Sequence, residues 1–479
     1  MPDSQGMKSP PLPRFTKVIF TIGPATVDVD VLRRMIRKGV DVCRINMAHA
    51  SHDWTLKAVA AVREASEAEG VGVSLLMDIK GPEVRTGHVD TQVELAKGQL
   101  IDLTQSAEAA PDGDIPAVDI NYPALIDEVD VGDVLLIDSG LMRFEIEELL
   151  IDRLRCRVVI PGSMGSRRHI NIPGKKINLP AMTEKDVADA KVGIEAGVDF
   201  FALSFVREAS DVLELKQFLN GHGSQAKVVS KIEDQSGIAN LNEIIEVSDA
   251  LMVARGDLGI EVPYEELPII QMQAVDAAVA AGIPVIMATH LLESMTESPM
   301  PTRAEITDVS NSVFEWVDCV MLSGETSVGK YPVECVNVLN KITRNVEQYA
   351  HRDGFNQSLT LTTTREKLMK SAVIMARELG GVGIVVYSSS GLHVRTLSAL
   401  RPQGCPIFVF TEKEQILRES KLLWGVTAFL TEFPDSQEAT IAASIYQLQS
   451  EGFAENGDQI IIVPNLLFGG VNMIQIRDV

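Results

Sequence analysis

Apolar residues in the first eighty positions recur in two alternating rhythms. Short runs rich in Val, Ile and Leu, such as Lys17–Ile22 and Val40–Ile45, predict strands that are buried on both faces. Amphipathic stretches near Val29–Lys38 and from about Asp53 to Glu69 predict helices between them, and a third strand follows at Val71–Leu76. Because strands and helices alternate, we expect a parallel sheet with right-handed crossovers.

This rhythm stops between about Glu83 and Leu179, where the pattern predicts no convincing helix. Short alternating stretches such as Gln92–Leu95, Val134–Ile137 and Cys156–Ile160 lie between Gly, Pro and Asp turns. We therefore expect an inserted antiparallel β domain. Since two connections would join it to the rest of the chain, it could swing as a lid.

The strand–helix rhythm resumes at Thr183, the predicted N-cap of a helix that runs to Gly197. Five further buried strands are predicted at Phe200–Phe205, Val228–Ile232, Ala250–Ala254, Pro284–Ala288 and Cys319–Leu322. Nearly all of the eight strands end in polar or charged residues. This pattern is typical of an α/β fold of the (β/α)₈ TIM barrel type, whose active site lies at the carboxyl ends of the strands. A doubly wound open sheet is the alternative, although it would more often have five or six strands.

A polar linker, His351–Thr364, precedes a second α/β domain. Its strands are predicted near Gly383–Tyr387, Ile407–Phe410, Val426–Leu430 and Gln459–Val463. After the first of them, Ser388, Ser389, Ser390 and Gly391 open a helix. Their backbone N–H groups could bind a phosphate, or the serines could simply cap the helix. We expect a tail at 1–15, a barrel at 16–82 and 180–350, a β lid at 83–179, and a C-terminal domain for regulation and oligomerisation at 351–479.

The overall charge argues against two classes of partner. The net charge is −23 and no run of Lys or Arg occurs, which disfavours nucleic acid and anionic membranes. The five cysteines are scattered without metal-binding spacing, so we expect reduced thiols and a cytoplasmic location. Residues 1–14 lack the apolar core of a signal peptide, and the longest apolar stretch, Ala277–Ala288, is too short to cross a bilayer.

The stretch Lys227–Gly259 carries the most informative chemistry. One predicted strand ends in Lys231 and Glu233, and the next is followed by Arg255 and Asp257. Carboxylates are the ligands that hard cations such as Mg²⁺ need, and a lysine suits a phosphate or a developing oxyanion. The alternative is a purely structural Lys–Glu pair at the strand ends.

Other predicted strand ends complete a larger polar set, which contains three cationic side chains and several carboxylates but no Cys nucleophile. Its members are Arg44, Asn46, Asp78, Arg85, Lys231, Glu233, Asp257, Thr289, Ser323 and Glu325. An anionic phosphorylated substrate bridged by a hard cation fits this inventory. In phosphoryl transfer the protein mainly positions the reactants and neutralises charge.

At this point the sequence resembles the pyruvate kinase family. Seven stretches match in the family's order: Phe20–Thr26, Arg44–His49, Asp78–Gly87, Ser230–Glu233, Met252–Glu261, Glu293–Glu305 and Leu322–Pro332. The resemblance covers about residues 16 to 479 and weakens after about 350. Long matches in a fixed order are far more specific than a single glycine motif.

The resemblance implies a reaction in which phosphoenolpyruvate and ADP give pyruvate and ATP. Carried over by position, Glu233 and Asp257 would hold Mg²⁺ or Mn²⁺. Lys231 would neutralise the transferring phosphoryl group and the enolate oxygen. Arg44 and Arg85 would contact phosphates of the substrate and the nucleotide.

The remaining roles are also implied only by the resemblance. The groups that would hold the substrate carboxylate are Ala254, Gly256, Asp257 and Thr289. Thr289 would also support protonation of the enolate. The nucleotide contacts would be Asn46, His49, Arg85 and, from the lid, Arg168. A potassium ion would bind Asn46, Asp78 and the carbonyl of Ile79.

Some positions depart from the family's pattern. Ala48 replaces a serine at the potassium site, whereas Glu83 is the residue of potassium-dependent members, so we expect weakened but retained activation by K⁺. His290 replaces a glutamine after Thr289. Ser388–His393 lacks the basic residues of a loop that binds sugar bisphosphates, and Asn465–Val479 lacks the aromatic and Arg residues that members activated by sugar bisphosphates use. Activation by fructose bisphosphate is therefore not expected, although another phosphorylated effector could bind at Ser388–Gly391.

Two other functions compete with the kinase. A lyase or aldolase on a phosphoenolpyruvate/pyruvate barrel would share the Glu/Asp pair but would usually lack the lid and the C-terminal domain. A catalytically inactive metabolite-binding paralogue should have lost Lys231, Glu233, Asp257 or Arg44, and all four are present. The resemblance also implies an allosteric homotetramer.

Overall fold

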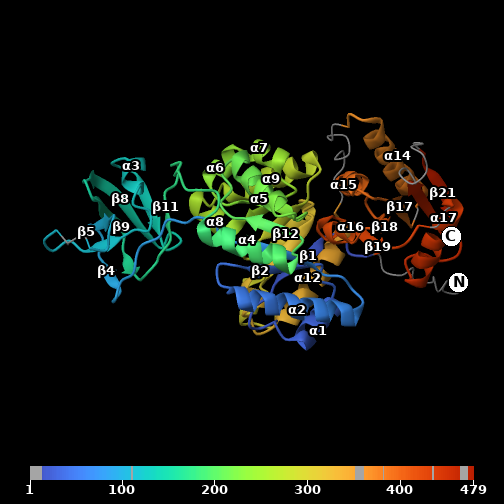
Figure 1. Ribbon diagram of the computed structural model, residues 1–479, viewed down its shortest axis with the longest axis horizontal. Coiled ribbons are helices and arrows are strands. Elements are labelled where there is room, and N and C mark those ends of the chain that lie inside the picture. The colour runs from blue at the N-terminus through green and yellow to red at the C-terminus, as the bar shows by residue number, and fades with distance from the viewer. Residues whose placement is uncertain (1–12, 109–111, 351–360, 381, 434–435, 464–472) are drawn as a thin grey trace, which may run out of the picture.

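Three parts follow one another along the long axis of the computed structural model, which describes residues 13–108, 112–350, 361–380, 382–433, 436–463 and 473–479. A β-rich lid lies at one end, a barrel lies in the middle and an α/β domain lies at the other end (Figure 1). Most of the predicted tail, most of the predicted linker and the first part of Asn465–Val479 lie outside the described residues.

The central part is a closed barrel of parallel strands. Its strands, in chain order, are β1 (Lys17–Thr21), β2 (Val42–Asn46), β3 (Ser74–Ile79), β12 (Phe200–Leu203), β13 (Lys227–Ile232), β14 (Ala250–Ala254), β15 (Val285–Ala288) and β16 (Cys319–Leu322). β1 pairs with β16, so the sheet has no free edge. The predicted (β/α)₈ barrel is confirmed and the doubly wound alternative is wrong.

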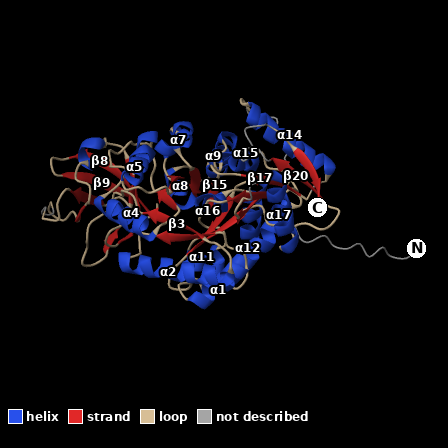
Figure 2. Cartoon of the chain, turned by 45° about the vertical axis from the view of Figure 1, so that its right-hand side comes forward, coloured by secondary structure: helices blue, strands red, loops and turns tan. Residues whose placement is uncertain are grey.

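Helices cover the outside of this barrel (Figure 2). They are α1 (Val29–Arg37), α2 (His52–Glu69), α4 (Glu184–Ala196), α5 (Ala209–Gly221), α6 (Gln235–Ala239), α7 (Leu241–Val247), α8 (Arg255–Glu261), α9 (Leu267–Ala281), α10 (Arg303–Phe314), α11 (Gly324–Ser327) and α12 (Pro332–Glu347), with a 3₁₀ turn at Glu293–Thr296. Thr183 caps α4 as predicted, in a reciprocal capping box with Asp186. Within the described parts of the chain, no helix is both long and apolar enough to cross a membrane.

Three barrel strands differ from the sequence prediction by two residues or more at one of their limits. The third strand begins at Ser74 rather than Val71, because Gly70 ends α2 in a left-handed conformation and a short loop follows. Asp78 therefore lies within the strand and not after it. The second strand is displaced in the same direction and includes Asn46. The fourth stops at Leu203, since Phe205 has a φ of 52° and cannot continue an extended strand.

The lid is a separate β domain with its own apolar core, which includes Leu103, Leu135, Phe144 and Leu154. Its elements are β4 (Val93–Leu95), β5 (Leu100–Thr104), β6 (Ala117–Asp119), α3 (Leu125–Glu128), β7 (Val134–Ile137), β8 (Met142–Leu149), β9 (Arg153–Ile160), β10 (Gly162–Met164) and β11 (Ile170–Asn171). The main sheet has the order β11-β7-β8-β9-β5-β6. The expected antiparallel character is wrong in one detail, because β5 and β6 run parallel, and the short helix α3 was not predicted.

The C-terminal domain is a five-stranded sheet in the order β19-β18-β17-β20-β21. Its elements are α14 (Thr364–Leu379), β17 (Gly383–Tyr387), α15 (Leu392–Ala399), β18 (Ile407–Thr411), α16 (Glu414–Glu419), a 3₁₀ turn at Ser420–Leu422, β19 (Val426–Leu430), α17 (Gln437–Ser450), β20 (Gln459–Val463) and β21 (Gln475–Asp478). Four strands were predicted. The fifth, β21, is a polar edge strand antiparallel to β20, and a sequence such as QIRD carries little strand signal.

A buried ion pair joins this domain to the barrel. Arg401 and Asp318 are each 2% exposed, and the guanidinium donates from both terminal nitrogens to the carboxylate, at 2.9 and 2.6 Å. The Trp424 ring lies 5.4 Å from the Arg401 guanidinium carbon and stacks on Trp316. The domain boundaries suggested by the sequence, at 82/83, 179/180 and 350/351, stay predictions.

Candidate functional site

Lys231 is the centre of a buried polar cluster at the carboxyl ends of the barrel strands. Its ammonium lies 2.8 Å from Glu233 Oε1 and 3.2 Å from Asp78 Oδ1, and it donates to Ser204 Oγ at 2.6 Å. Lys231 and Glu233 are two residues apart at the end of β13, so an extended chain directs both side chains to the same side. The neighbouring strand β12 ends just before Ser204.

Arg44 joins the cluster from the other side. Its Nε donates to Asp78 Oδ2 at 2.7 Å, and its Nη1 donates to Thr21 Oγ1 at 3.0 Å. Asp78 thus holds one cation on each carboxylate oxygen. The barrel register explains this arrangement, because β3 pairs with β2, which carries Arg44, and with β12, which pairs in turn with β13.

The charges in this cluster shift one another's pKa values. Burial alone would raise the pKa of Asp78, but Lys231 and Arg44 hold it below its usual range. Burial alone would lower the pKa of Lys231, but the Asp78 and Glu233 carboxylates hold it above its usual range. Lys231 is therefore a cation at neutral pH, held in a place from which water is largely excluded.

Glu233 and Asp257 form the second half of the site. Glu233 is 1% exposed and its Oε2 accepts the backbone N–H of Phe205 at 2.7 Å. Asp257 lies in the first turn of α8, directly after β14. Burial raises the pKa of Glu233, Lys231 lowers it, and the Asp257 carboxylate raises it again. The two carboxylates are thus near enough to repel each other, and a divalent cation between them would relieve this repulsion.

The donor set fits a magnesium-like ion that also binds substrate. Mg²⁺ commonly uses one or two carboxylates together with substrate oxygens and water. Among the described residues, no group of three or more His, Cys, Asp or Glu side chains converges to hold a metal by itself.

Thr289 and its neighbours form a strained turn beside α8. Thr289 has a φ of 68°, a value that costs a β-branched residue about 1–3 kcal/mol, and His290 has a φ of 56°. The Thr289 hydroxyl accepts the N–H of Gly256 at 2.8 Å. Arg255 points away to Asp308 and to the Thr289 carbonyl, at 2.6 and 2.7 Å. The Gly256 N–H and the Thr289 hydroxyl therefore lie together. The assignment of Ala254, Gly256, Asp257 and Thr289 to the substrate carboxylate, implied by the resemblance, stays a prediction.

The predicted nucleotide contacts come from two parts of the molecule. Asn46 ends β2, and His49 is exposed in the loop that follows. Arg85 lies at the base of the lid, where it donates to the Glu83 carboxylate at 2.7 Å and to the Arg167 carbonyl at 2.8 Å. Arg168 belongs to the lid and pairs with Asp138 at 3.2 Å. The two arginines are therefore held by lid residues rather than by the barrel.

The predicted potassium ligands lie on adjacent strands. Asn46 is the register partner of Asp78. The Asn46 Oδ1 accepts the N–H of Ala48 at 3.1 Å, and the Ile79 carbonyl accepts the Ser204 hydroxyl at 2.8 Å. A carbonyl oxygen has two lone pairs, so both oxygens keep capacity for a cation.

The predicted effector loop is a compact helix cap. Ser388 is 1% exposed, and its hydroxyl accepts the Gly391 N–H at 2.9 Å. Gly391 has a φ of 75° and is the N-cap of α15, whereas Ser389 and Ser390 are exposed. This geometry agrees with the alternative that the serines cap the helix, and it leaves Ser389 and Ser390 open to solvent.

Some contacts of the site were not anticipated from the sequence. Thr21 and Ser204 orient Arg44 and Lys231, and each is a small polar residue at a strand end, which is the only signal that could have pointed to them. Conversely, Glu325 was grouped with the strand-end set, but it is fully buried and accepts the N–H groups of Leu292 and Ser323. Its role there is to hold backbone together.

The chain matches known proteins along nearly its whole length. The family model described as the barrel domain of pyruvate kinase matches residues 13–336, and the one described as its alpha/beta domain matches residues 366–477. A pyruvate kinase from Geobacillus stearothermophilus is 37% identical over 97% of this chain and 80% of its own length. One from Dictyostelium discoideum is 37% identical over 95% of this chain and 92% of its own length. The crystal structure of a pyruvate kinase from Cryptosporidium parvum superposes with a TM-score of 0.92 at 33% identity, covering 97% of this chain and 96% of that one.

Proposed function

This chain belongs to the pyruvate kinase family, and we propose from that premise how its own residues divide the work of moving a phosphoryl group from phosphoenolpyruvate to ADP. The phosphorus–oxygen bond to the enol oxygen breaks, and a bond forms to a terminal oxygen of ADP. The enolate that remains takes a proton at its methylene carbon to give pyruvate. Negative charge therefore has to be stabilised first on the phosphoryl oxygens and then on the enolate oxygen.

Lys231 and Arg44 supply fixed positive charge for these oxygens. Both are held by Asp78, so neither has to be reoriented when the substrate arrives. Lys231 faces the transferring group and the enolate oxygen, while Arg44 faces the phosphoryl group. Two unit charges about 4 Å apart attract by roughly 4 kcal/mol at an effective dielectric of 20, so these cations suffice to favour the charged transition state.

Pyruvate kinases in general depend on a divalent cation and on K⁺. In this chain we assign Mg²⁺ or Mn²⁺ to Glu233 and Asp257, because two neighbouring carboxylates that repel each other fit such an ion. When bound, the ion would supply Lewis-acid stabilisation to the substrate oxygens. The Phe205 N–H donates to Glu233 and holds this carboxylate in place.

The turn at Thr289 fixes the other end of the substrate. The Gly256 N–H, in the first turn of α8, donates to the Thr289 hydroxyl. We assign the substrate carboxylate to this place, held by Ala254, Gly256, Asp257 and Thr289. A hydroxyl can pass a proton to or from water, so Thr289 supports the protonation of the enolate through a water molecule.

The lid contributes to the nucleotide side. We assign Arg85 and Arg168 on the lid, with Asn46 and His49 on the barrel, to contacts with ADP and ATP. Since the lid and barrel groups are on different domains, closure of the lid would complete this half of the site.

The single observation that carries the proposal is the pairing of Lys231 with both Asp78 and Glu233 at the barrel mouth. We expect pyruvate to form from phosphoenolpyruvate only when ADP and Mg²⁺ or Mn²⁺ are both present, and removal of the metal by EDTA to stop turnover. A lactate dehydrogenase-coupled assay measures this. Pyruvate formation without ADP would favour the lyase instead, and no turnover at all would favour the inactive paralogue; the family matches favour neither alternative.

Potassium should activate the enzyme weakly. The potassium site proposed at Asn46, Asp78 and Ile79 has one hydroxyl ligand fewer, because Ala48 stands where the family has a serine. Glu83 pairs with Lys80 and Arg85. We expect omission of K⁺ to lower kcat, and the Ala48→Ser variant to reach half-maximal activation at about tenfold less K⁺, since one oxygen ligand is restored. Steady-state rates at varied KCl, with ionic strength held by tetramethylammonium chloride, measure this. An unchanged rate without K⁺ contradicts it.

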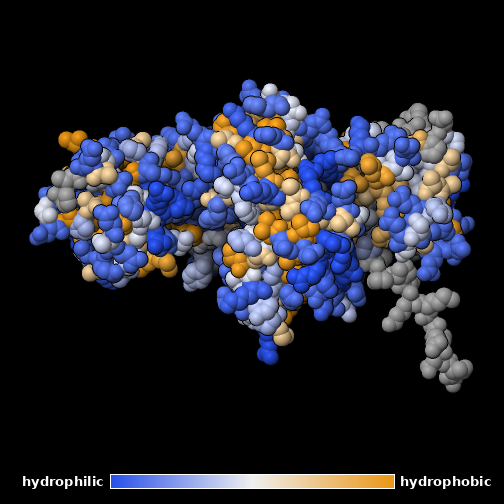
Figure 3. Space-filling model, turned by 60° about the horizontal axis from the view of Figure 1, so that its bottom comes forward, coloured by the Kyte–Doolittle hydropathy of each residue, from blue (hydrophilic) through white to orange (hydrophobic). Residues whose placement is uncertain are grey.

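The surface of the barrel supports self-association. Large apolar side chains are exposed on α9 and α10, including Ile269, Met272, Ile306 and Phe314. Apolar surface also gathers over the central part of the molecule on the face in Figure 3. We propose a homotetramer in which such surface is covered. Any effector at Ser389 and Ser390 would be a phosphorylated compound other than fructose bisphosphate.

A further inference from the structure

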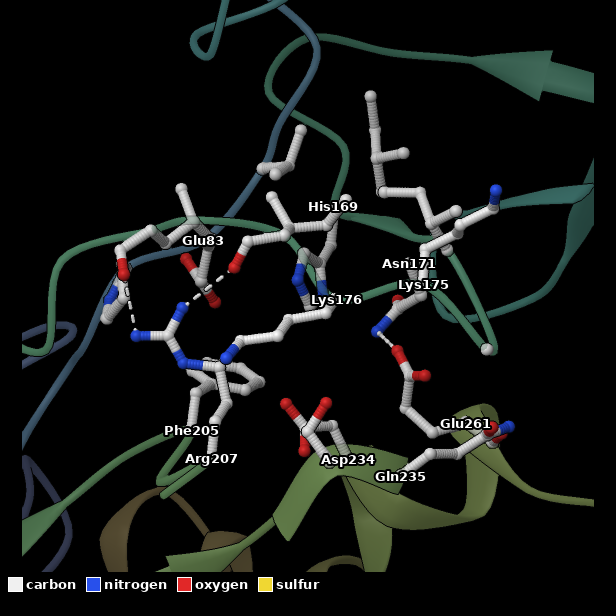
Figure 4. Close-up of a pocket in the computed structure, with 18 of the residues that line it drawn as sticks. Glu83, His169, Asn171, Lys175, Lys176, Phe205, Arg207, Asp234, Gln235 and Glu261 are labelled. Atoms are coloured by element: carbon white, nitrogen blue, oxygen red, sulfur yellow. Dashed lines mark hydrogen bonds between the residues drawn. The ribbon is translucent and has the colours of Figure 1, made fainter. Parts of the chain in front are cut away.

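A cavity of about 280 Å³ lies where the two connections of the lid meet the barrel. Its lid wall includes Glu83, Asn171 and Lys176, and its barrel wall includes Asp234 and Glu261 (Figure 4). The two walls belong to parts that would move against each other if the lid swings. A contact between the two walls would therefore form or break as the lid changes position.

One buried hydrogen bond crosses this cavity. The Asn171 amide nitrogen donates to Glu261 Oε1 at 2.6 Å, and Figure 4 shows the two side chains meeting at one side of the space. Asn171 is 5% exposed and Glu261 is 9% exposed. Because water is largely excluded, loss of either partner would leave a buried polar group unsatisfied.

Both ends of this bond are anchored in regular structure. Asn171 is paired with Leu136 in the lid sheet through β11 and β7. Glu261 is the last residue of α8, whose first turn carries Asp257. The Glu261 backbone carbonyl also accepts a hydrogen bond from the Gln235 amide, two residues after Glu233. Glu261 thus connects the lid sheet with both segments that carry the metal carboxylates.

The other side-chain contacts between lid and barrel in this region are of a different kind. Lys176 pairs with Glu208 at 3.3 Å, but both side chains are largely exposed, so the pair contributes little. Arg207 donates to the carbonyls of Ile177 and Leu179, which lie on the connecting segment rather than in the lid sheet. Of these contacts, only the Asn171–Glu261 bond joins the lid sheet to α8.

We propose that Asn171 and Glu261 form a latch that couples the position of the lid to the placement of Glu233 and Asp257. Glu261 is then a positioning residue for the divalent cation, although it does not touch the ion. The latch rests on the metal site assigned under the proposed function. The latch gives a reason for the burial of the Glu261 carboxylate and for its hydrogen bond with the Asn171 amide.

The test measures Mn²⁺ binding to the full-length protein without substrate, by electron paramagnetic resonance. We expect Asn171→Ala and Glu261→Ala each to weaken Mn²⁺ binding about tenfold, the usual lower effect of losing a residue that supports a metal ligand. As Mn²⁺ binding weakens, KM for phosphoenolpyruvate should rise, while kcat changes less than about threefold. Glu261→Gln should stay close to the parent protein, because its amide oxygen can accept the same bond. Lys176→Ala is the matched control and should change nothing.

Other outcomes are equally informative. If Asn171→Ala and Glu261→Ala bind Mn²⁺ as tightly as the parent while Glu233→Gln does not, the latch is wrong and the metal site stands. If Glu233→Gln also binds Mn²⁺ normally, the metal site itself is wrong. The double variant separates coupling from local damage: a true pair loses no more in the double variant than in either single one, and additive losses overturn the latch. Circular dichroism melting shows whether each variant is folded.

Discussion

Lys231→Met lowers kcat by about 10³ or more, because one fixed charge that stabilises phosphoryl transfer is commonly worth that much. This factor corresponds to about 4 kcal/mol of transition-state stabilisation. In the structure Lys231 is the cation between Asp78 and Glu233, and no other lysine has an ion pair with either carboxylate among the described residues. Methionine has a similar length and no charge, so the change removes the cation with little loss of volume.

The control for this variant is Lys216→Met. Lys216 pairs with Asp249, just before β14 begins and hence at the opposite end of the barrel. It should keep normal kcat in the coupled assay. Since Lys231→Met also leaves two buried carboxylates without their ammonium, the melting temperature and the binding of phosphoenolpyruvate are measured alongside. A folded Lys231→Met enzyme with kcat within tenfold of the parent value would remove Lys231 from the mechanism.

Arg401→Met destabilises the folded protein by about 3–5 kcal/mol, the usual cost of stranding one partner of a buried ion pair. The Asp318 carboxylate would keep only the N–H groups of Val285 and Trp424, and would lose both bonds from the guanidinium. Trp424 would lose the cation above its ring. The midpoint of thermal unfolding should therefore fall by at least about 5 °C.

Arg377→Met provides the comparison for this prediction. Arg377 pairs with Glu378 on the surface of α14, where both side chains are more than 60% exposed. Such a pair contributes at most about 1 kcal/mol, so its loss should leave the unfolding midpoint nearly unchanged. Differential scanning calorimetry at one protein concentration compares the two. Equal midpoints for Arg401→Met and Arg377→Met would show that the buried pair does not hold the C-terminal domain on the barrel.

The barrel could be predicted because its signal is local. Ala250–Ala254 and Cys319–Leu322 are apolar runs between polar boundaries, and their limits agree with β14 and β16. The predicted strand limits were wrong where the backbone conformation excluded an apolar residue from the strand. Val71 is apolar but lies in a loop after the left-handed Gly70, and Phe205 is apolar but has a positive φ. β21 was missed because an edge strand needs only one neighbour and its side chains are half exposed.

The structure brings the charged residues singled out from the sequence into one cluster, whereas two neutral residues in that cluster were not anticipated. Lys231, Glu233 and Arg44 stand out because an ionisable residue next to a buried strand needs an explanation. Ser204 and Thr21 are unremarkable in sequence, and only the register of the barrel brings them to Lys231 and Arg44. The same limit applies to Asn171 and Glu261, which are ninety residues apart and meet only through the fold.

The lid and the barrel bury their apolar side chains in two separate cores. The apolar packing inside the lid is therefore not continuous with the apolar core of the barrel that holds Lys231. Over evolutionary time the lid could vary in length and composition while the chemical machinery stayed constant. Residues at the junction, such as Glu83 and Asn171, could not be substituted as freely, because they contact both the lid and the barrel.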